Sequence, residues 1–335
     1  MNRYHAFALA MAMIGPATGV RAATTDTSPH KIQFITVQDG VKLEVLDWGG
    51  DGRPLIFLPG LGGTAHDFDK FALRFTAKHH VYGITRRGFG ASDKPEPAIS
   101  NYAAGRLGDD VLAVMGALKV VHPVLAGHSI AGSELSSVAS RHPEKISGLI
   151  YLDAAYVYAF YAPGIMPLYL NFDVNALHAR VRKLNQGSIS PALAKIEIDE
   201  LLKSSLPQLQ ADLRMTRKYL DQIAPPRVGA PIPSDSQPLD PAGAVLAGVQ
   251  KYGTVKVPVL AIYAFPTKIP PQTAAALRAD IVAHDAINRR TADLFAIGNP
   301  KAKVVRIANS EHDVYSSNPV EVEREINAFM DGLLY

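Results

Sequence analysis

The stretch VLAGHSIAG, at residues 124–132, decides the fold. An apolar run precedes Ser129 and a helical pattern follows it, so the serine is predicted to lie at a strand-to-helix turn. The pattern from Gly127 to Ala131 closely matches the turn G-x-S-x-G, in which small flanking residues let the backbone bend sharply and expose the serine oxygen. Ala131 takes the second glycine position and is still small enough for this geometry. Ser129 is therefore a candidate nucleophile.

Short apolar runs elsewhere in the chain predict a sheet around this turn. Central parallel strands are covered by helices on both faces, so they read as continuous apolar segments. Such segments occupy residues 54–58, 80–84, 123–126, 148–152, 257–262 and 303–307. Helical patterns lie between them, and this alternation is typical of a parallel α/β sheet. Residues 31–37 and 41–47, joined by Asp39-Gly40, predict an antiparallel hairpin at the start of the fold.

The strand–helix alternation stops between residues 156 and 254. Helical patterns at residues 177–184, 192–202 and 206–223 are followed by a proline-rich segment, and no strand-like run interrupts them. We therefore expect a helical cap at residues 156–254. It is inserted into a core domain made of residues 31–155 and 255–335.

Residues 1–22 are predicted to be a signal peptide rather than part of the fold. Arg3 gives a positive start, a mostly apolar run covers residues 6–20, and Ala22 ends a cleavage pattern of small residues. The run is shorter than the roughly 20 apolar residues that cross a bilayer. We expect cleavage after Ala22, a periplasmic or extracellular location, and no stable membrane anchor.

Composition narrows the function classes. The chain has 335 residues, of which 47% are hydrophobic and 19% charged, as in ordinary globular proteins. The formal net charge is only +3 and no long basic run is present, which argues against nucleic-acid binding. With no cysteine there are no disulfides. No His/Asp/Glu group has convincing metal-ligand spacing and no nucleotide-binding glycine motif occurs, so no metal or cofactor is expected.

Two further loops supply candidate partners for the serine. The glycine-rich segment at residues 58–63 follows the first parallel strand and can turn the backbone N–H of Leu61 toward Ser129. Together with the N–H of Ile130 it would form an oxyanion hole. His312 follows the last strand, from where it can reach over the edge of the sheet as a general base.

These segments together resemble the α/β-hydrolase superfamily, from Phe34 to the last helix. The patterns R-G-F-G-x-S at residues 87–92 and G-H-S-x-x-G at residues 127–132 are similar to its esterase, lipase and epoxide-hydrolase branch, which carries a helical cap. The resemblance implies that Ser129 is the nucleophile and His312 the base. Epoxide hydrolases and haloalkane dehalogenases place an aspartate at this turn, so Ser129 departs from them and favours acyl transfer.

The acid of the triad is less clearly marked. The family usually places it after the seventh strand, but residues 263–268 contain no carboxylate. Some members hold it at the end of the sixth strand, where this chain has Asp153, and the chain order Ser–Asp–His is then kept. A purely local, turn-capping role for Asp153 stays open. The competing carboxylates are Asp280, Asp285, Asp293 and Asp313.

The expected activity is hydrolysis of carboxylic esters of small molecules through an acyl-enzyme. Four aromatic residues follow the presumed acid and are expected either at the pocket mouth or in cap packing: Tyr156, Tyr158, Phe160 and Tyr161. His128 is expected to pack beside the nucleophile rather than act as a base. The same triad could serve a lactonase, an amidase or peptidase, or a carbon–carbon bond hydrolase. A ligand-binding protein without turnover is the alternative from another class.

The signal peptide gives a first prediction. Protein recovered from a bacterial periplasm should have an intact mass that begins at Ala23, because signal peptidase reads the small residues before that position. Mass spectrometry of the purified chain checks this. Full-length chain found in the membrane fraction would contradict it.

Overall fold

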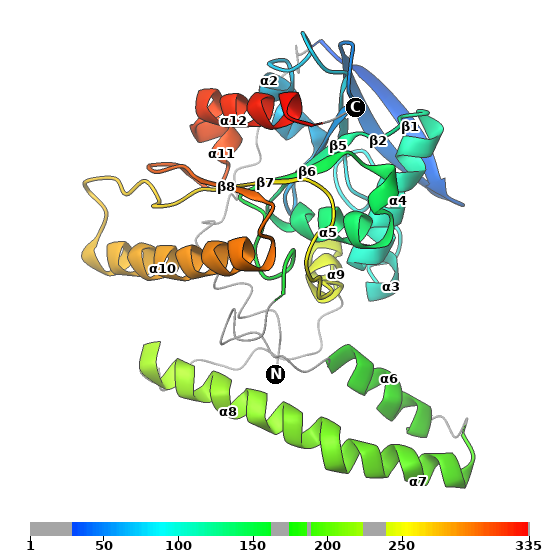
Figure 1. The fold of residues 1–335 in the computed structure, drawn as a ribbon. Helices are drawn as coiled ribbons and strands as arrows, with labels where there is room; N and C mark the ends of the chain where they lie inside the picture. The colour runs from blue at the N-terminus through cyan, green and yellow to red at the C-terminus, as the bar shows by residue number, and fades with distance from the viewer. Residues whose placement is uncertain (1–28, 162–173, 186–188, 224–238, 334–335) are drawn as a thin grey trace. The chain divides into compact units, whose positions relative to one another are not determined.

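The computed structural model describes residues 29–161, 174–185, 189–223 and 239–333. The predicted signal peptide lies outside these residues. Within them, eight strands form one sheet in the order β1-β2-β4-β3-β5-β6-β7-β8 (Figure 1). The strands are β1 (Lys31–Gln38), β2 (Val41–Gly49), β3 (Leu55–Leu58), β4 (Val81–Ile84), β5 (Val124–His128), β6 (Gly148–Leu152), β7 (Val259–Tyr263) and β8 (Lys303–Arg306).

The pairing of the strands confirms the predicted architecture. β1 is antiparallel to β2 and β2 to β4, while all pairs from β4 to β8 are parallel. The hairpin turns at Gly40, whose φ of +68° is a backbone conformation that favours glycine. The six apolar runs are the strands β3 to β8, and β3 to β7 are buried along their whole length. The fold is therefore a mostly parallel sheet with an antiparallel N-terminal hairpin.

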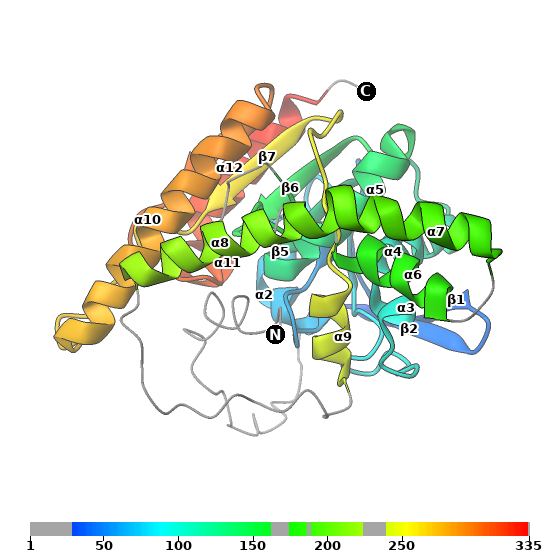
Figure 2. The same cartoon turned by 90° about the horizontal axis from the view of Figure 1, so that it is seen from below.

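Helices cover both faces of this sheet. α2 (Asp69–Ala72) and α12 (Pro319–Asp331) lie on one face, and α4 (Ala104–Ala117), α5 (Gly132–Arg141) and α10 (Ala275–Gly298) on the other (Figure 1; Figure 2). Because β5 and β6 are covered on both sides, their carboxyl ends are the places where polar side chains can gather. The shorter elements are η1 (Ala65–Phe68), η2 (Ser129–Ala131), η3 (Pro143–Lys145), α3 (Ile99–Tyr102), α9 (Pro241–Ala247) and α11 (Val314–Ser317).

The chain divides into two compact units, residues 1–162 with 236–335, and residues 163–235. The first unit contains the sheet. The second contains the helices predicted for the cap: α6 (Val174–Asn185), α7 (Pro191–Glu200), η4 (Leu201–Ser205) and α8 (Leu206–Ile223). This second unit, residues 163–235, contains fewer residues than the predicted insertion of residues 156–254. The residues at both ends of that insertion belong to the unit that contains the sheet. There Tyr161 donates its backbone N–H to the Tyr252 carbonyl at 2.7 Å.

A wide helical turn joins α7 to α8. The backbone of η4 is a π-helix, and Pro207 follows it at the second position of α8. Proline has no N–H to donate to the preceding turn and its ring crowds the carbonyl there, so a locally widened turn lets the helix continue. Among the described residues, no helix is both long and apolar enough to span a membrane.

A close backbone approach holds the start of α5 against the segment after β6. A Cβ atom on Gly132 would lie only 2.1 Å from the carbonyl oxygen of Ala154. No side chain tolerates that separation, so the glycine is required where the helix leaves the strand-to-helix turn. The contact links the two loops that carry Ser129 and Asp153.

This contact predicts a large difference between two glycine substitutions. Gly132→Ala should lower the free energy of unfolding by at least about 2 kcal/mol, because the helix or the Ala154 backbone must shift. Gly116→Ala, in an exposed part of α4 with no atom within 4 Å of the added Cβ, should instead raise it by about 0.5–1 kcal/mol. Urea unfolding measures both values. Similar effects for the two variants would contradict the close approach.

Candidate active site

The predicted strand-to-helix turn lies between β5 and α5. β5 ends at His128, and the next residue, Ser129, has a φ of +52°. A left-handed backbone at a residue other than glycine is strained, and it persists where the surrounding structure enforces it. Ile130 then lies in the first turn of η2, where backbone N–H groups have no partner within the helix. The turn thus carries the Ser129 hydroxyl together with backbone N–H groups that have no partner within the helix. Such N–H groups are the donors that stabilisation of an oxyanion requires.

Asp153 and His312 meet at the carboxyl edge of the sheet. Asp153 follows β6, and its Oδ2 atom lies 2.6 Å from Nδ1 of His312. A carboxylate can only accept a hydrogen bond, so Nδ1 of His312 carries the hydrogen and Nε2 is left as the acceptor. The Oδ1 atom of Asp153 accepts two more bonds, from the Tyr156 hydroxyl at 2.5 Å and the Ala264 N–H at 2.9 Å.

These contacts set the charges of the pair. Burial by itself would raise the pKa of Asp153, but the His312 imidazole, the Ala264 amide and the Tyr156 hydroxyl together hold that pKa below its usual range. Burial likewise disfavours the imidazolium form of His312. The hydrogen bond and negative charge of Asp153 outweigh burial and raise the pKa of His312 above 6.5. The imidazole is thereby made a stronger base.

His128 holds the backbone of the His312 loop. Its Nε2 donates to the His312 carbonyl at 3.1 Å, and the two rings lie 4.6 Å apart between centroids. Burial, with the nearby positive charge of His312, lowers the pKa of His128 to about 3, so it is neutral at physiological pH. The His128 ring also packs against Tyr315, whose own ring packs on Phe68 in the core at 4.6 Å. His128 therefore has the packing role expected from the sequence.

The loop after β3 is fixed against the same turn. A Cβ on Gly60 would lie 2.8 Å from Nδ1 of His128 and 3.4 Å from Cβ of Ser129. The buried Arg86 guanidinium donates to the carbonyls of Pro59 and Gly60 at 2.8 and 3.0 Å, and to Glu134 of α5. These contacts fix Gly60, the residue before Leu61, against the turn at Ser129. Arg86 directly precedes the pattern at residues 87–92, and the sequence predicted no role for it.

The competing carboxylates that the structure describes are engaged elsewhere. Asp285 accepts hydrogen bonds from both the backbone N–H and the hydroxyl of Thr267, at 2.8 and 2.6 Å. Asp293 pairs with Arg306 at 2.5 Å. Asp313 is mostly exposed and approaches His128 at 3.4 Å. The side chain of Asp280 lies outside the described residues. Among the described candidates, the carboxylate within hydrogen-bond distance of the His312 ring is that of Asp153.

The tyrosines after Asp153 differ from one another. Tyr156 bonds to the acid itself, which explains its position more directly than a place at the pocket mouth does. The Lys251 ammonium lies over the Tyr161 ring, 4.5 Å from its centroid. Tyr161 thus contacts a residue of the unit that contains the sheet. Tyr158, expected with Tyr156 and Tyr161 either at the pocket mouth or in cap packing, is buried and its hydroxyl hydrogen-bonds to Ser129. The sequence did not predict its contact with Ser129, because only the fold brings the two side chains together.

Comparison with known proteins places this arrangement in a family. The sequence pattern of the alpha/beta hydrolase fold matches residues 53–319. The chain belongs to this family. Among curated relatives, the chain is 25% identical over 139 residues to a 2-(acetamidomethylene)succinate hydrolase of Mesorhizobium japonicum, covering 42% of this chain and 44% of that one. It is 24% identical over 197 residues to the sn-1-specific diacylglycerol lipase ABHD11 of Xenopus tropicalis, covering 56% and 59%.

The matched segments thus span about half the length of these curated relatives. Solved structures of alpha/beta hydrolases match more of the chain. The epoxide hydrolase VrEH1 from Vigna radiata gives a TM-score of 0.56 at 16% identity, covering 91% of this chain and 99% of that one. The esterase EaEST from Exiguobacterium antarcticum gives 0.55 at 15% identity, covering 90% and 99%. At these identities the similarity shows the shared fold, and relatives of this fold are hydrolases.

The pair of Asp153 and His312 predicts a particular pH dependence. A base must be neutral to take a proton, so kcat/KM for an ester should be full above the raised pKa of His312 and fall as the pH drops through it, above 6.5. In Asp153→Asn the charge that raises this pKa is gone while burial remains, so the midpoint should move below that of the wild type. Turnover should fall by up to about ten-thousand-fold.

A matched variant controls for removal of a carboxylate as such. Asp293→Asn changes an aspartate that pairs with Arg306, and it should keep the wild-type midpoint and rate. The measurement is kcat/KM for a chromogenic ester between pH 5 and 9. An unchanged midpoint in Asp153→Asn would mean that another group sets the pKa of His312.

Proposed function

We propose that this alpha/beta hydrolase is a serine hydrolase that cleaves carboxylic esters through an acyl-enzyme. The observation that carries the proposal is the Asp153–His312 hydrogen bond at 2.6 Å, which orients a base at the edge of the sheet where Ser129 forms a left-handed turn. A nucleophile, a base and a group that orients the base are what acyl transfer by serine requires.

The mechanism follows from the position of the ring hydrogen on Nδ1 of His312. Since Nδ1 of His312 is bonded to Asp153, its Nε2 lone pair takes the hydroxyl proton as Ser129 attacks the ester carbonyl. The N–H groups of Leu61 and Ile130 bind the negative oxygen of the tetrahedral intermediate. The imidazolium then gives its proton to the leaving alcohol. Water repeats the steps on the acyl-enzyme and releases the carboxylic acid.

A serine as the nucleophile argues against attack on an alkyl carbon, the reaction of epoxide hydrolases. An epoxide hydrolase of the same fold attacks through a carboxylate, and here the corresponding position is Ser129. A relative named as a diacylglycerol lipase supports ester hydrolysis. A relative named as a 2-(acetamidomethylene)succinate hydrolase is the reason for retaining other hydrolytic reactions as alternatives. Lactonase, amidase or peptidase, and carbon–carbon bond hydrolase remain the alternatives, and a binding protein without turnover is the alternative of another class.

The proposed substrate is a small molecule, and the export predicted from residues 1–22 supports the proposal that the enzyme meets this substrate outside the cytoplasm. A purified-protein screen against matched esters, lactones and amides of the same acyl chain tests the preference among substrates. Esters turned over at least about tenfold faster than the other two classes support the proposal. Exclusive turnover of amides or lactones would replace it by one of the alternatives.

Ser129→Ala tests the nucleophile. Removing the serine of a triad can lower turnover about a million-fold, because the covalent route is lost. The variant should also lose labelling by a fluorophosphonate probe while keeping its far-ultraviolet circular dichroism and melting temperature. Ser100→Ala, at an exposed serine of α3, is the matched control and should be labelled like the wild type. Wild-type ester turnover in Ser129→Ala would refute the assignment.

A further inference from the structure

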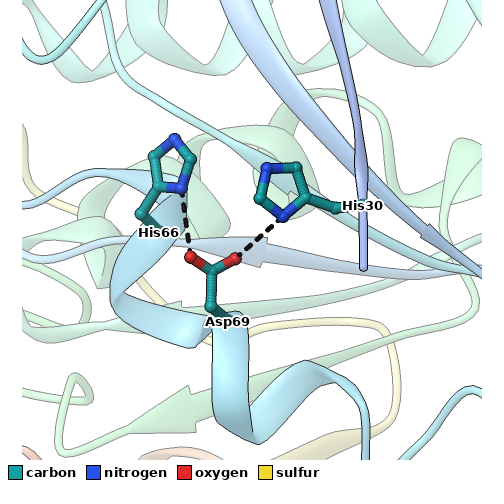
Figure 3. Close-up of side chains that lie close together, drawn as sticks. All are labelled: His30, His66 and Asp69. Atoms are coloured by element: carbon teal, nitrogen blue, oxygen red, sulfur yellow. Dashed lines mark hydrogen bonds and ion pairs between the residues drawn. The ribbon is translucent and has the colours of Figure 1, made fainter. Parts of the chain in front are cut away.

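A second group of polar side chains lies outside the candidate active site. His30 precedes β1, His66 lies on η1, and Asp69 begins α2. Figure 3 shows both imidazole rings facing the carboxylate of Asp69, one toward each oxygen. The three side chains offer one ligand atom each, and these atoms lie within 4.8 Å of one another. Within the part of the chain that the structure describes, this is the group suited to hold a metal ion.

The distances are close to those around a small cation. Nδ1 of His30 is 3.4 Å from one oxygen of Asp69, and Nδ1 of His66 is 3.1 Å from the other. Tetrahedral zinc with bonds of about 2.0–2.1 Å keeps neighbouring ligand atoms roughly 3.3 Å apart. The two nitrogens face different oxygens of Asp69 and the ligand atoms lie within 4.8 Å of one another, so side-chain rotations would bring them together around an ion.

Glu44 lies beside the second ring nitrogen of His66 and bears on where the ring hydrogen is held. Its Oε1 lies 3.5 Å from Nε2 of His66, while its Oε2 accepts the Thr85 hydroxyl at 2.6 Å. Without an ion, Nδ1–H of His66 donates to Asp69 at 3.1 Å. An ion bound at Nδ1 would take the place of that hydrogen, and the ring hydrogen would then lie on Nε2, beside Glu44. A metal-bound histidine commonly donates its other N–H to a carboxylate in this way.

The surroundings hold Asp69 and His30 in place. The indole N–H of Trp48 donates to Oδ1 of Asp69 at 3.1 Å. The His30 ring packs edge-on against both Trp48 and His66, with centroids 6.3 and 5.2 Å apart. A site with its ligand atoms preset in this manner loses little side-chain freedom when an ion binds.

We propose that His30, His66 and Asp69 bind a divalent zinc ion, with Glu44 orienting His66. Two imidazole nitrogens and one carboxylate oxygen are the donor set that zinc accepts, whereas magnesium and calcium take oxygen ligands. The ion joins the start of β1 to η1, directly after the loop of residues 59–63. Its function is to brace that loop. The site is independent of the proposed ester hydrolysis.

Trp48 makes the site measurable. It is the single tryptophan of the chain and is bonded to a proposed ligand, so its fluorescence reports on this group. Protein purified without a histidine tag and stripped with EDTA should bind about one equivalent of zinc by atomic absorption. The Trp48 emission should change and saturate during the same titration. At a hundredfold excess over Kd the melting temperature should rise by roughly 4 °C. Calcium should give no such response.

Variants separate this site from the candidate active site. Asp69→Asn keeps an acceptor for Trp48 but removes the charge, and His66→Gln changes a side chain that is partly exposed, so both should fold and lose the saturable zinc response. His142→Ala, at a histidine whose Nδ1 lies 3.7 Å from Glu144 and away from the proposed ligands in the chain, should keep it. If the wild type gives no saturable response, or if Asp69→Asn and His66→Gln respond like the wild type, the proposal is wrong. In the first case a proton on His66 joins the two carboxylates instead.

Discussion

A left-handed turn between β5 and α5 constrains everything around it. The backbone at Ser129 is strained, and it is held by close contacts on both sides. Gly132 lies against the Ala154 carbonyl, and Gly60 lies against His128 and Ser129, so neither position accepts a side chain. The loops after β3, β5 and β6 are therefore packed together by these close approaches. This packing brings Ser129 and Asp153 to one edge of the sheet.

The buried charge of Asp153 is the second consequence. An ionised carboxylate in the interior is costly unless donors surround it, and here an imidazole, an amide and a phenol do so. Each donor comes from a different part of the chain. The same pattern recurs at Asp69, where a tryptophan and two histidines surround a carboxylate. At Asp153 the geometry stabilises a proton on His312, whereas at Asp69 it suits a metal ion.

The buried Arg86 connects these regions. Its guanidinium holds two carbonyls of the loop after β3 and pairs with Glu134 at the start of α5. The same loop continues into η1, where Ala65 donates its N–H to the Thr85 hydroxyl and Thr85 in turn donates to Glu44. Hydrogen bonds of the neighbouring residues Thr85 and Arg86 thus connect the start of α5, the loop after β3 and Glu44. Fixing either end restrains the loop that carries Leu61.

The sequence by itself determined the strands, the turn at Ser129 and the chain order of Ser129, Asp153 and His312, because apolar periodicity and turn chemistry are local. Only the tertiary structure decided which carboxylate faces His312 and that Tyr156 bonds to the acid. It also revealed Tyr158 beside the serine and His30 beside His66 and Asp69, where the sequence predicted no metal-ligating group. These residues meet through pairings between strands and loops distant in the chain. No short-range pattern encodes such contacts, since side-chain distances across a sheet depend on how every intervening element packs.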